Sequence, residues 1–300
     1  MTMVESRLIL TPRANARFPT TNGQKPLRLR LGWSTIITSV SNVNLSRARL
    51  APFITLISAL SLPLGAADIC DPGHLQGTYG FQLSGDTTIS GNSRPVTSLS
   101  RLVFDGDGGL SGYSSVMFAG FLLGNPVTGS YEVGSDCKMS WSLQDDSGAF
   151  QHFSGVITGK RVQFVQTDPG GAQRGIAART SDECTALDLQ KKYDFTLSGS
   201  SIPMMPGEVS STVAAEGLIA ADDSGNFKLT LRDHPWVTTD VTVTVESDCF
   251  VQIGLALPAE AGETITLMTL RGILLNDGRE ILAIQTDPGA SVSARFTAHQ

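Results

Sequence analysis

The sequence is poor in the residues that usually carry chemistry. Its 300 residues include four histidines and four cysteines, and the cysteines stand far apart from one another. Zinc sites use ligand pairs two to four residues apart, so this spacing argues against a metal site. After residue 67 there is no nucleophile elbow, no HExxH helix, no phosphate-binding loop and no dinucleotide fingerprint. We therefore expect no cofactor, and an enzyme is the less favoured class.

Basic residues are scarce beyond the first 67 positions. Residues 1–67 hold eight of the 22 basic residues and one of the 28 acids, which leaves 14 basic (22 − 8) and 27 acidic (28 − 1) residues. Binding to nucleic acid needs a basic stripe, which this acidic balance does not provide. The excess of acid favours solubility outside the cell.

Residues 1–67 read as a leader with a secretory signal peptide. Arg47 and Arg49 precede an apolar run over residues 50–64, and three small residues at 65–67 follow it. A basic segment, then an apolar run, then a small-residue cleavage site is the order found in a secretory signal peptide. The run is short for a membrane span, so we expect none, with a retained membrane anchor as the alternative. The protein is predicted to be secreted or periplasmic.

The chain after residue 67 contains an internal repeat. Each copy opens with a cysteine and an aromatic alternation, continues to Ser-Asp-Cys, and ends in Gln-Thr-Asp-Pro-Gly. The matching positions are Cys70 and Cys184, Tyr79 and Tyr193, Phe81 and Phe195, Cys137 and Cys249, and Gly170 and Gly289. A repeat of this length is a whole small domain. We expect domains over residues 68–181 and 182–300.

The cysteine spacing favours one disulfide in each copy. Cys70 and Cys137 are 67 residues apart, and Cys184 and Cys249 are 65 apart. Four cysteines allow three pairings, and the near-equal spacing favours the two local ones. Closing a loop of that length stabilises a domain by roughly 3–4 kcal/mol.

Both copies consist of short segments rich in Val, Ile, Thr, Phe and Tyr, separated by Gly, Asp, Asn and Pro. The short links predict hairpins between neighbours, and about eight strands close into an up-and-down barrel. The fold class is therefore all-β, two tandem antiparallel barrels, with β-sandwiches as the alternative. The strands are expected near 77–84, 97–104, 110–119, 128–135, 137–145, 149–158, 161–167 and 173–179, and near 191–198, 210–221, 227–233, 238–246, 249–257, 263–275, 279–286 and 291–298.

Alternation along the strands predicts which side chains enter each barrel. The inward aromatic residues give an apolar lumen that either holds one small apolar ligand or is filled by the side chains themselves. The candidate ligand-binding residues are Tyr79, Phe81, Trp141, Phe164, Tyr193 and Phe195.

The outer face of the second copy is more apolar than that of the first. Phe250 lies on this face, where the first copy has Lys138, Ser140 and Ser142, and residues 281–284 are apolar on both faces. A strand buried on both sides indicates that a barrel wall packs against something. The other copy and a second molecule are both candidates, so self-association through barrel walls is a possible interaction.

The order of the motifs resembles a known group of barrels. GTYGF at 77–81, the D-G-x-G turn at 105–108, the Gly129–Tyr131 strand leading to Asp136-Cys137, and QTDPG at 166–170 resemble tandem domains of the allene oxide cyclase-like group of calycin-type barrels. Plant cyclases of that group close an unsaturated epoxide in an apolar barrel without a cofactor, and related dirigent proteins steer radical coupling. The resemblance implies a cofactor-free cyclase or isomerase as the alternative function. The shared motifs are turns and core positions, so no catalytic residue of the group maps onto this sequence.

One histidine is the candidate for proton transfer. His152 shares a strand face with Phe150 and lies one strand from Trp141, so an inward ring would meet the lumen, whereas a surface histidine is the plainer alternative. Asp168 and Asp287 of the repeated QTDPG motif are expected to be turn residues. None of the histidines recurs in the other copy; they are His74, His152, His234 and His299.

Overall fold

The computed structural model describes residues 70–257 and 266–299, so the predicted leader and signal peptide lie outside the described residues. The described part is all-β, as predicted, apart from two single-turn 3-10 helices, η1 (Pro72–Leu75) and η2 (Ala186–Asp188). No helix in this part of the chain is long and apolar enough to cross a membrane.

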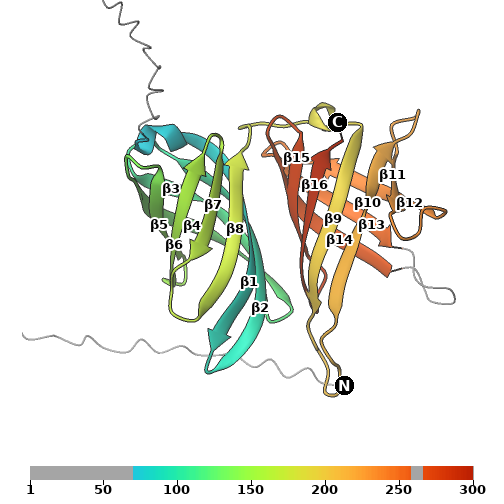
Figure 1. The fold of residues 1–300 in the computed structure, drawn as a ribbon, viewed down its shortest axis with the longest axis horizontal. Coiled ribbons are helices and arrows are strands. Elements are labelled where there is room, and N and C mark those ends of the chain that lie inside the picture. The colour runs from blue at the N-terminus through green and yellow to red at the C-terminus, as the bar shows by residue number, and fades with distance from the viewer. Residues whose placement is uncertain (1–69, 258–265, 300) are drawn as a thin grey trace, which may run out of the picture. The chain divides into compact units, whose positions relative to one another are not determined.

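The first eight strands close into a barrel in chain order (Figure 1). Each strand is antiparallel to the next, and the last strand pairs back with the first, with Phe81 opposite Ala177. The strands are β1 (Gly77–Ile89), β2 (Asn92–Phe104), β3 (Gly109–Phe118), β4 (Phe121–Val133), β5 (Lys138–Asp145), β6 (Phe150–Thr158), β7 (Arg161–Gln166) and β8 (Gly171–Arg179).

The second repeat forms an equivalent closed barrel in which the last strand pairs with β9. Two up-and-down barrels were predicted and are confirmed, so the sandwich alternative is wrong. The strands are β9 (Lys192–Ser201), β10 (Thr212–Ala221), β11 (Phe227–Leu231), β12 (Thr238–Val245), β13 (Phe250–Leu257), β14 (Thr266–Leu275), β15 (Glu280–Gln285) and β16 (Ala290–Ala298).

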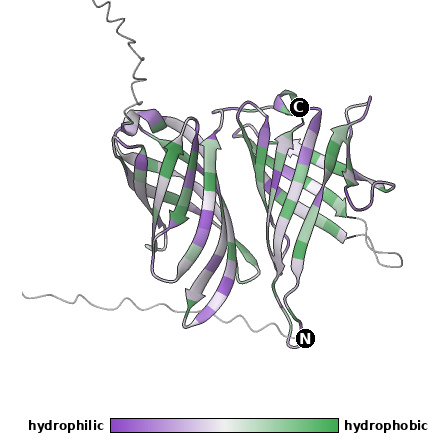
Figure 2. Cartoon of the chain, in the orientation of Figure 1, coloured by the Kyte–Doolittle hydropathy of each residue, from purple (hydrophilic) through white to green (hydrophobic). Residues whose placement is uncertain are grey.

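Alternation of side chains builds the two cores. On β9, Tyr193, Phe195 and Leu197 are buried, while Asp194 and Thr196 between them are exposed. Figure 2 shows the resulting bands of hydrophobic and hydrophilic residues along the strands. Burying an aliphatic or aromatic side chain of this kind stabilises a fold by roughly 1.5–3 kcal/mol.

Each barrel contains one disulfide of its own, as the cysteine spacing predicted. Cys70 bonds to Cys137, and Cys184 bonds to Cys249. The second cysteine of each pair occupies the same turn between two strands and has a positive φ, 62° and 68° respectively. In both turns its N–H donates to the carbonyl three residues earlier, Gly134 in one and Glu246 in the other. The repeat therefore conserves the whole turn as well as the cysteine.

The two barrels belong to one compact unit, joined by a second apolar core. All six residues of β15 are buried, which explains why residues 281–284 are apolar on both faces. We call the outer face of β13–β16 the docking wall and the face of the first barrel beneath it the receiving face. The docking wall contributes Phe250, Ile273, Leu275, Leu282 and Ile284, and the receiving face contributes Leu99 and Ala178.

Two residues of the receiving face allow the two barrel walls to pack closely. Gln82 donates through Nε2 to the carbonyls of Ala283, at 2.7 Å, and Ala294, at 3.0 Å. Gly80 allows close approach, because a Cβ there would lie 2.7 Å from Leu275 Cδ2 and 2.8 Å from Ile273 Cγ2. The predicted packing of a barrel wall against the other copy is thus realised by an apolar core with hydrogen bonds at its edge.

Candidate functional sites

The predicted ligand-binding residues of the first barrel form an aromatic core. Phe81 lies 5.9 Å from Trp141 and 5.5 Å from Phe164, and the Trp141 and Phe164 rings are 5.1 Å apart between centroids. Tyr79 packs edge-on against Phe104 at 5.5 Å. Tilted and edge-on contacts at these distances are the favoured geometries of aromatic pairs. These rings pack against one another across the lumen.

The space that remains inside the first barrel is small. A cavity of about 20 Å³ lies beside Phe81, Trp141 and Phe164 and is edged by serine hydroxyls. Ser100 donates to Ser114 there at 2.8 Å, while the buried indole Nε1 of Trp141 has no hydrogen-bond partner among the described residues. A cavity of this size holds about one water molecule, which needs polar partners of this kind. The lumen in this form has no room for a larger ligand.

In the second barrel, Tyr193 and Phe195 serve the fold. Phe195 packs on Phe296 at 5.1 Å. The Tyr193 hydroxyl donates to the Gly278 carbonyl at 2.7 Å and accepts from the Gln190 N–H at 2.8 Å. Burial raises the pKa of Tyr193, so the phenol stays protonated and can donate. Tyr193 therefore ties the start of β9 to the β14–β15 turn.

His152 lies on the outer face of the first barrel, with 57% of its side chain exposed. Its ring stacks on Phe150, with centroids 6.5 Å apart, as their shared strand face indicated. Nδ1 lies 2.7 Å from Asp168 Oδ1, and the His152 N–H donates to Asp168 Oδ2 at 2.8 Å. The structure thus places His152 outside the lumen, in a local hydrogen-bonded pair.

The aspartates of the two QTDPG motifs do the same structural work. Asp168 binds the backbone of His152, and Asp287 accepts from the Thr269 N–H at 2.7 Å. Burial raises the pKa of Asp168, but hydrogen bonds from the His152 N–H, the His152 ring and Gln166 lower it to a value below the usual one. In the second barrel the same hydrogen bond from a backbone N–H to the aspartate forms with Thr269 in place of His152. The QTDPG motif is therefore explained by its role in the fold.

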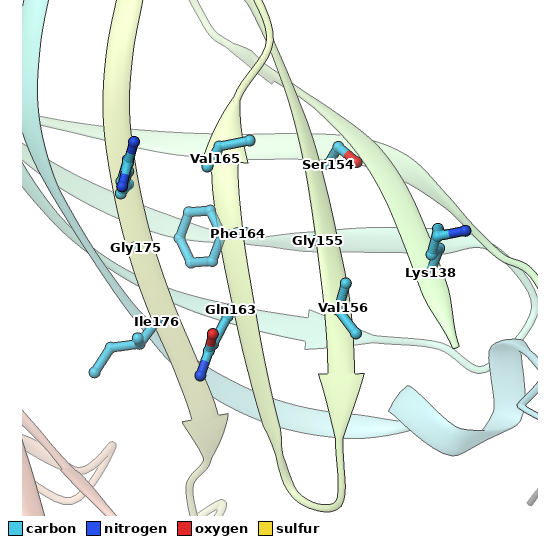
Figure 3. A pocket seen from close by; sticks show the side chains of 10 residues that line it. Lys138, Ser154, Gly155, Val156, Gln163, Phe164, Val165, Gly175 and Ile176 are labelled. Carbon is cyan, nitrogen blue, oxygen red and sulfur yellow. The ribbon is translucent and has the colours of Figure 1, made fainter. Parts of the chain in front are cut away.

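The outer wall of the first barrel carries a groove that sequence reasoning missed. Its floor is Phe164, which pairs directly with Gly155 on β6 and Gly175 on β8 (Figure 3). A Cβ on Gly175 would lie 2.3 Å from the Phe164 ring, so glycine leaves space for that ring. The hollow has a volume of about 470 Å³, and its rim consists of Lys138, Ser154, Val156, Gln163, Val165, Arg174 and Ile176.

This wall groove is amphipathic and open to solvent. Val156 and Val165 are 47% and 42% exposed, and Lys138 and Arg174 stand at its rim. The sequence did contain one signal for the groove: Lys138 stands on the face where the second copy has Phe250. This difference points to an exposed wall and a covered wall only once the residues around each position are known.

The fold defines a class: a tandem up-and-down β-barrel protein with one disulfide per barrel, a bond typical of extracytoplasmic proteins. No protein-family model matches the sequence, and no curated protein matches it. Because of this, the resemblance to the allene oxide cyclase-like group stays a prediction.

Three solved structures resemble the chain at low identity. Intact Ap-TbpB, with N and C lobes, is 10% identical over 74% of this chain and 76% of its own, with a TM-score of 0.27. A mutant of the vaccine antigen transferrin binding protein B from Haemophilus parasuis is 9% identical over 75% and 76%, with a TM-score of 0.30. A porin-like protein from Bacteroides uniformis is 11% identical over 76% and 98%, with a TM-score of 0.17. At these values the likenesses carry no argument about this protein.

Proposed function

We propose that this protein is a secreted structural module that assembles with copies of itself, the wall groove of one copy binding the second barrel of the next. One observation carries the proposal. The wall groove is the repeat equivalent of the docking wall, and it is exposed. An interface already used once inside the chain therefore has a second version on its surface, which the rest of the described chain does not cover.

The strand registers establish this equivalence. Gly155, Phe164 and Gly175 form one cross-strand row, and Gly272, Ala283 and Ala294 form the same row in the second barrel. Side chains that flank the two rows then correspond in order. In the first barrel Lys138, Val156, Gln163 and Val165 stand where the docking wall has Phe250, Ile273, Leu282 and Ile284.

The receiving face also has a second version, on the second barrel. Its registers place Asp194 at the position of Gly80, Thr196 at that of Gln82, and Glu216 at that of Leu99. We call this exposed surface the acidic face. It lacks the apolar patch of the receiving face and carries two carboxylates in its place.

Charge makes the two exposed surfaces complementary. Lys138 and Arg174 at the wall groove would meet Asp194 and Glu216 of a second copy. Within one chain Lys138, Asp194 and Glu216 have exposed ionic partners, which contribute little stability and exchange readily. A contact between two different surfaces does not close on itself, so such assembly forms chains of molecules. Because ion pairs replace apolar contacts, the association is expected to weaken with salt.

Sedimentation velocity over a range of protein concentrations tests the proposal. At low salt the protein should form concentration-dependent oligomers that dissociate near 0.5 M salt, where charges are screened over about 4 Å. The variant Lys138→Glu/Arg174→Glu should stay monomeric alone, and so should Asp194→Lys/Glu216→Lys. Mixed together, the two variants should again form chains, because the unmodified groove of one matches the unmodified acidic face of the other and the two reversed surfaces also match.

A control variant separates this interaction from net charge. Arg94 is exposed on β2 and belongs to neither surface, so Arg94→Glu should assemble like the unmodified protein. A protein that is monomeric at every concentration and salt tested would contradict the proposal. Oligomers that survive both sets of charge reversals would contradict it as well.

The proposal places the working surface outside the barrels. A small apolar ligand in the lumen would have to displace rings that pack against one another, and a lumenal cyclase reaction would lack His152, which lies on the outer face. Mass spectrometry of the native protein from its own host checks this directly. A bound small apolar molecule at one equivalent would favour the ligand-binding alternative.

A further inference from the structure

A cleft at the junction of the barrels gathers positive charge in an otherwise acidic protein. It has a volume of about 620 Å³ and is lined by the β6–β7 turn of the first barrel and by the β14–β15 turn and the end of β16 of the second. Lys160, Arg161 and Arg279 line it, opposed by Asp277 and Glu280.

Glu280 at the base of the cleft is already neutralised. It is 2% exposed and forms ion pairs with Arg161 of the first barrel and with Arg295, whose Nε lies 2.7 Å from Oε1. Asn276 Nδ2 also donates to Glu280 Oε2 at 3.0 Å. Two guanidinium groups on one buried carboxylate leave a local excess of one positive charge, and they fix Arg161 across the junction.

Two further cations in the cleft have no acidic partner. Among residues 70–257 and 266–299, no carboxylate lies within ion-pair distance of Lys160 or Arg279. Both side chains are exposed on turns that face the cleft. Other cations of the described residues, among them Arg174 and Lys191, also appear in no ion pair, but Lys160 and Arg279 line one cleft together with Arg161.

A second hollow adjoins the cleft. It measures about 280 Å³, shares Lys160, Asn276 and Asp277 with the cleft, and adds Arg179 and Asp182, so its cations and acids are balanced. Amide and hydroxyl groups of Gln190, Thr158 and Thr297 also line the cleft. Polar neutral groups beside cations are suited to orient a ligand that carries both negative charge and hydroxyls.

We infer that this cleft binds a small, multiply charged oxyanion ligand, a molecule with phosphate or carboxylate groups held by Lys160 and Arg279 and oriented by the neighbouring amides and hydroxyls. The volume lies within the roughly 300–1,000 Å³ typical of small-molecule sites, which are common at domain junctions. The fixed guanidinium of Arg161 adds a donor that needs no rearrangement on binding. The site uses none of the residues of the wall groove or the acidic face.

Isothermal titration calorimetry with pyrophosphate and with citrate tests the inference on the full protein. At 50 mM salt we expect saturable binding of one molecule for at least one of the two anions, weakened several-fold at 200 mM salt. Lys160→Ala/Arg279→Ala should reduce the affinity at least tenfold. Arg161 is left unchanged because its loss would expose the buried Glu280 charge.

A matched control carries the same loss of charge elsewhere. Arg94→Ala/Lys228→Ala removes two cations outside the cleft and outside both proposed assembly surfaces, and this variant should bind as the unmodified protein does. If the two anions bind the unmodified protein and both double variants equally, binding is nonspecific and the inference fails. It also fails if neither anion gives saturable heat at millimolar concentration.

Discussion

The junction between the barrels provides a prediction with an internal control. Ile284 and Val165 occupy the same position in the two repeats, but Ile284 is fully buried in the docking wall while Val165 is 42% exposed. Ile284→Ala removes three carbon groups from a packed core. At about 0.8 kcal/mol for each group this loses about 2.4 kcal/mol, and the cavity left behind raises the loss to about 3 kcal/mol.

The equivalent change in the first barrel should cost much less. Val165→Ala removes two carbon groups that are already partly in water, so we expect a loss of about 0.5–1 kcal/mol. Urea unfolding followed by circular dichroism gives both values, provided that the slope of free energy against urea is unchanged. A second measurement, fluorescence of Trp141 in a variant with Trp33 and Trp236 replaced by Phe, reports whether weakening the junction separates the two unfolding transitions.

The outcome that refutes this reasoning is equal destabilisation by the two substitutions. That result would mean that the docking wall is not buried in solution and that the barrels are independent. A loss below about 1 kcal/mol for Ile284→Ala would lead to the same conclusion, because a buried isoleucine rarely gives so small an effect.

Two further predictions concern the individual barrels. Replacing both Cys184 and Cys249 with alanine should lower the unfolding free energy by about 4 kcal/mol, since the disulfide closes a 65-residue loop. Thermal melts should show a lower melting temperature. An unchanged melting temperature would exclude a stabilising role for this disulfide. Asp168→Asn should cost about 1 kcal/mol at pH 7, where the charged carboxylate accepts its hydrogen bonds. The pKa of Asp168 is depressed, so its contribution is present above the usual aspartate value and is lost as pH falls below about 4. The melting temperatures of Asp168→Asn and the unmodified protein should therefore converge as pH falls from 7 to 2. The control is His152→Thr, which copies Thr269 of the second barrel and keeps the backbone hydrogen bond to Asp168. Its melting temperatures should follow those of the unmodified protein more closely.

Much of the fold could be predicted because its determinants are local. Strand alternation and Gly- and Asp-rich turns located all sixteen strands, and the cysteine spacing located both disulfides. The least accurate boundary was the start of β4, at Phe121 where 128 was expected. The next were in the hairpin of β1 and β2, which extend to Ile89 and back to Asn92. This hairpin runs past the core, so its polar tip lacks the alternation that marks a strand in sequence, although Asp86 still pairs with Pro95.

The candidate sites were less predictable because they depend on packing between distant segments. Apolar residues on both faces of β15 did indicate a covered wall. Whether the lumen is filled depends on how Phe81, Trp141 and Phe164 pack, which alternation does not determine. Arg161 and Glu280 are 119 residues apart in sequence and meet only when the docking wall is in place.

Intermolecular cross-linking tests the central claim, assembly through repeat-equivalent walls, most directly. Equal amounts of unlabelled and nitrogen-15-labelled protein are mixed and treated with a zero-length carbodiimide, which joins amines to carboxylates in contact. The account predicts peptides of mixed isotope composition that join Lys138 to Asp194 or Glu216. Cross-links at Lys138 found only within one isotope, or mixed cross-links that avoid both acids, would contradict it.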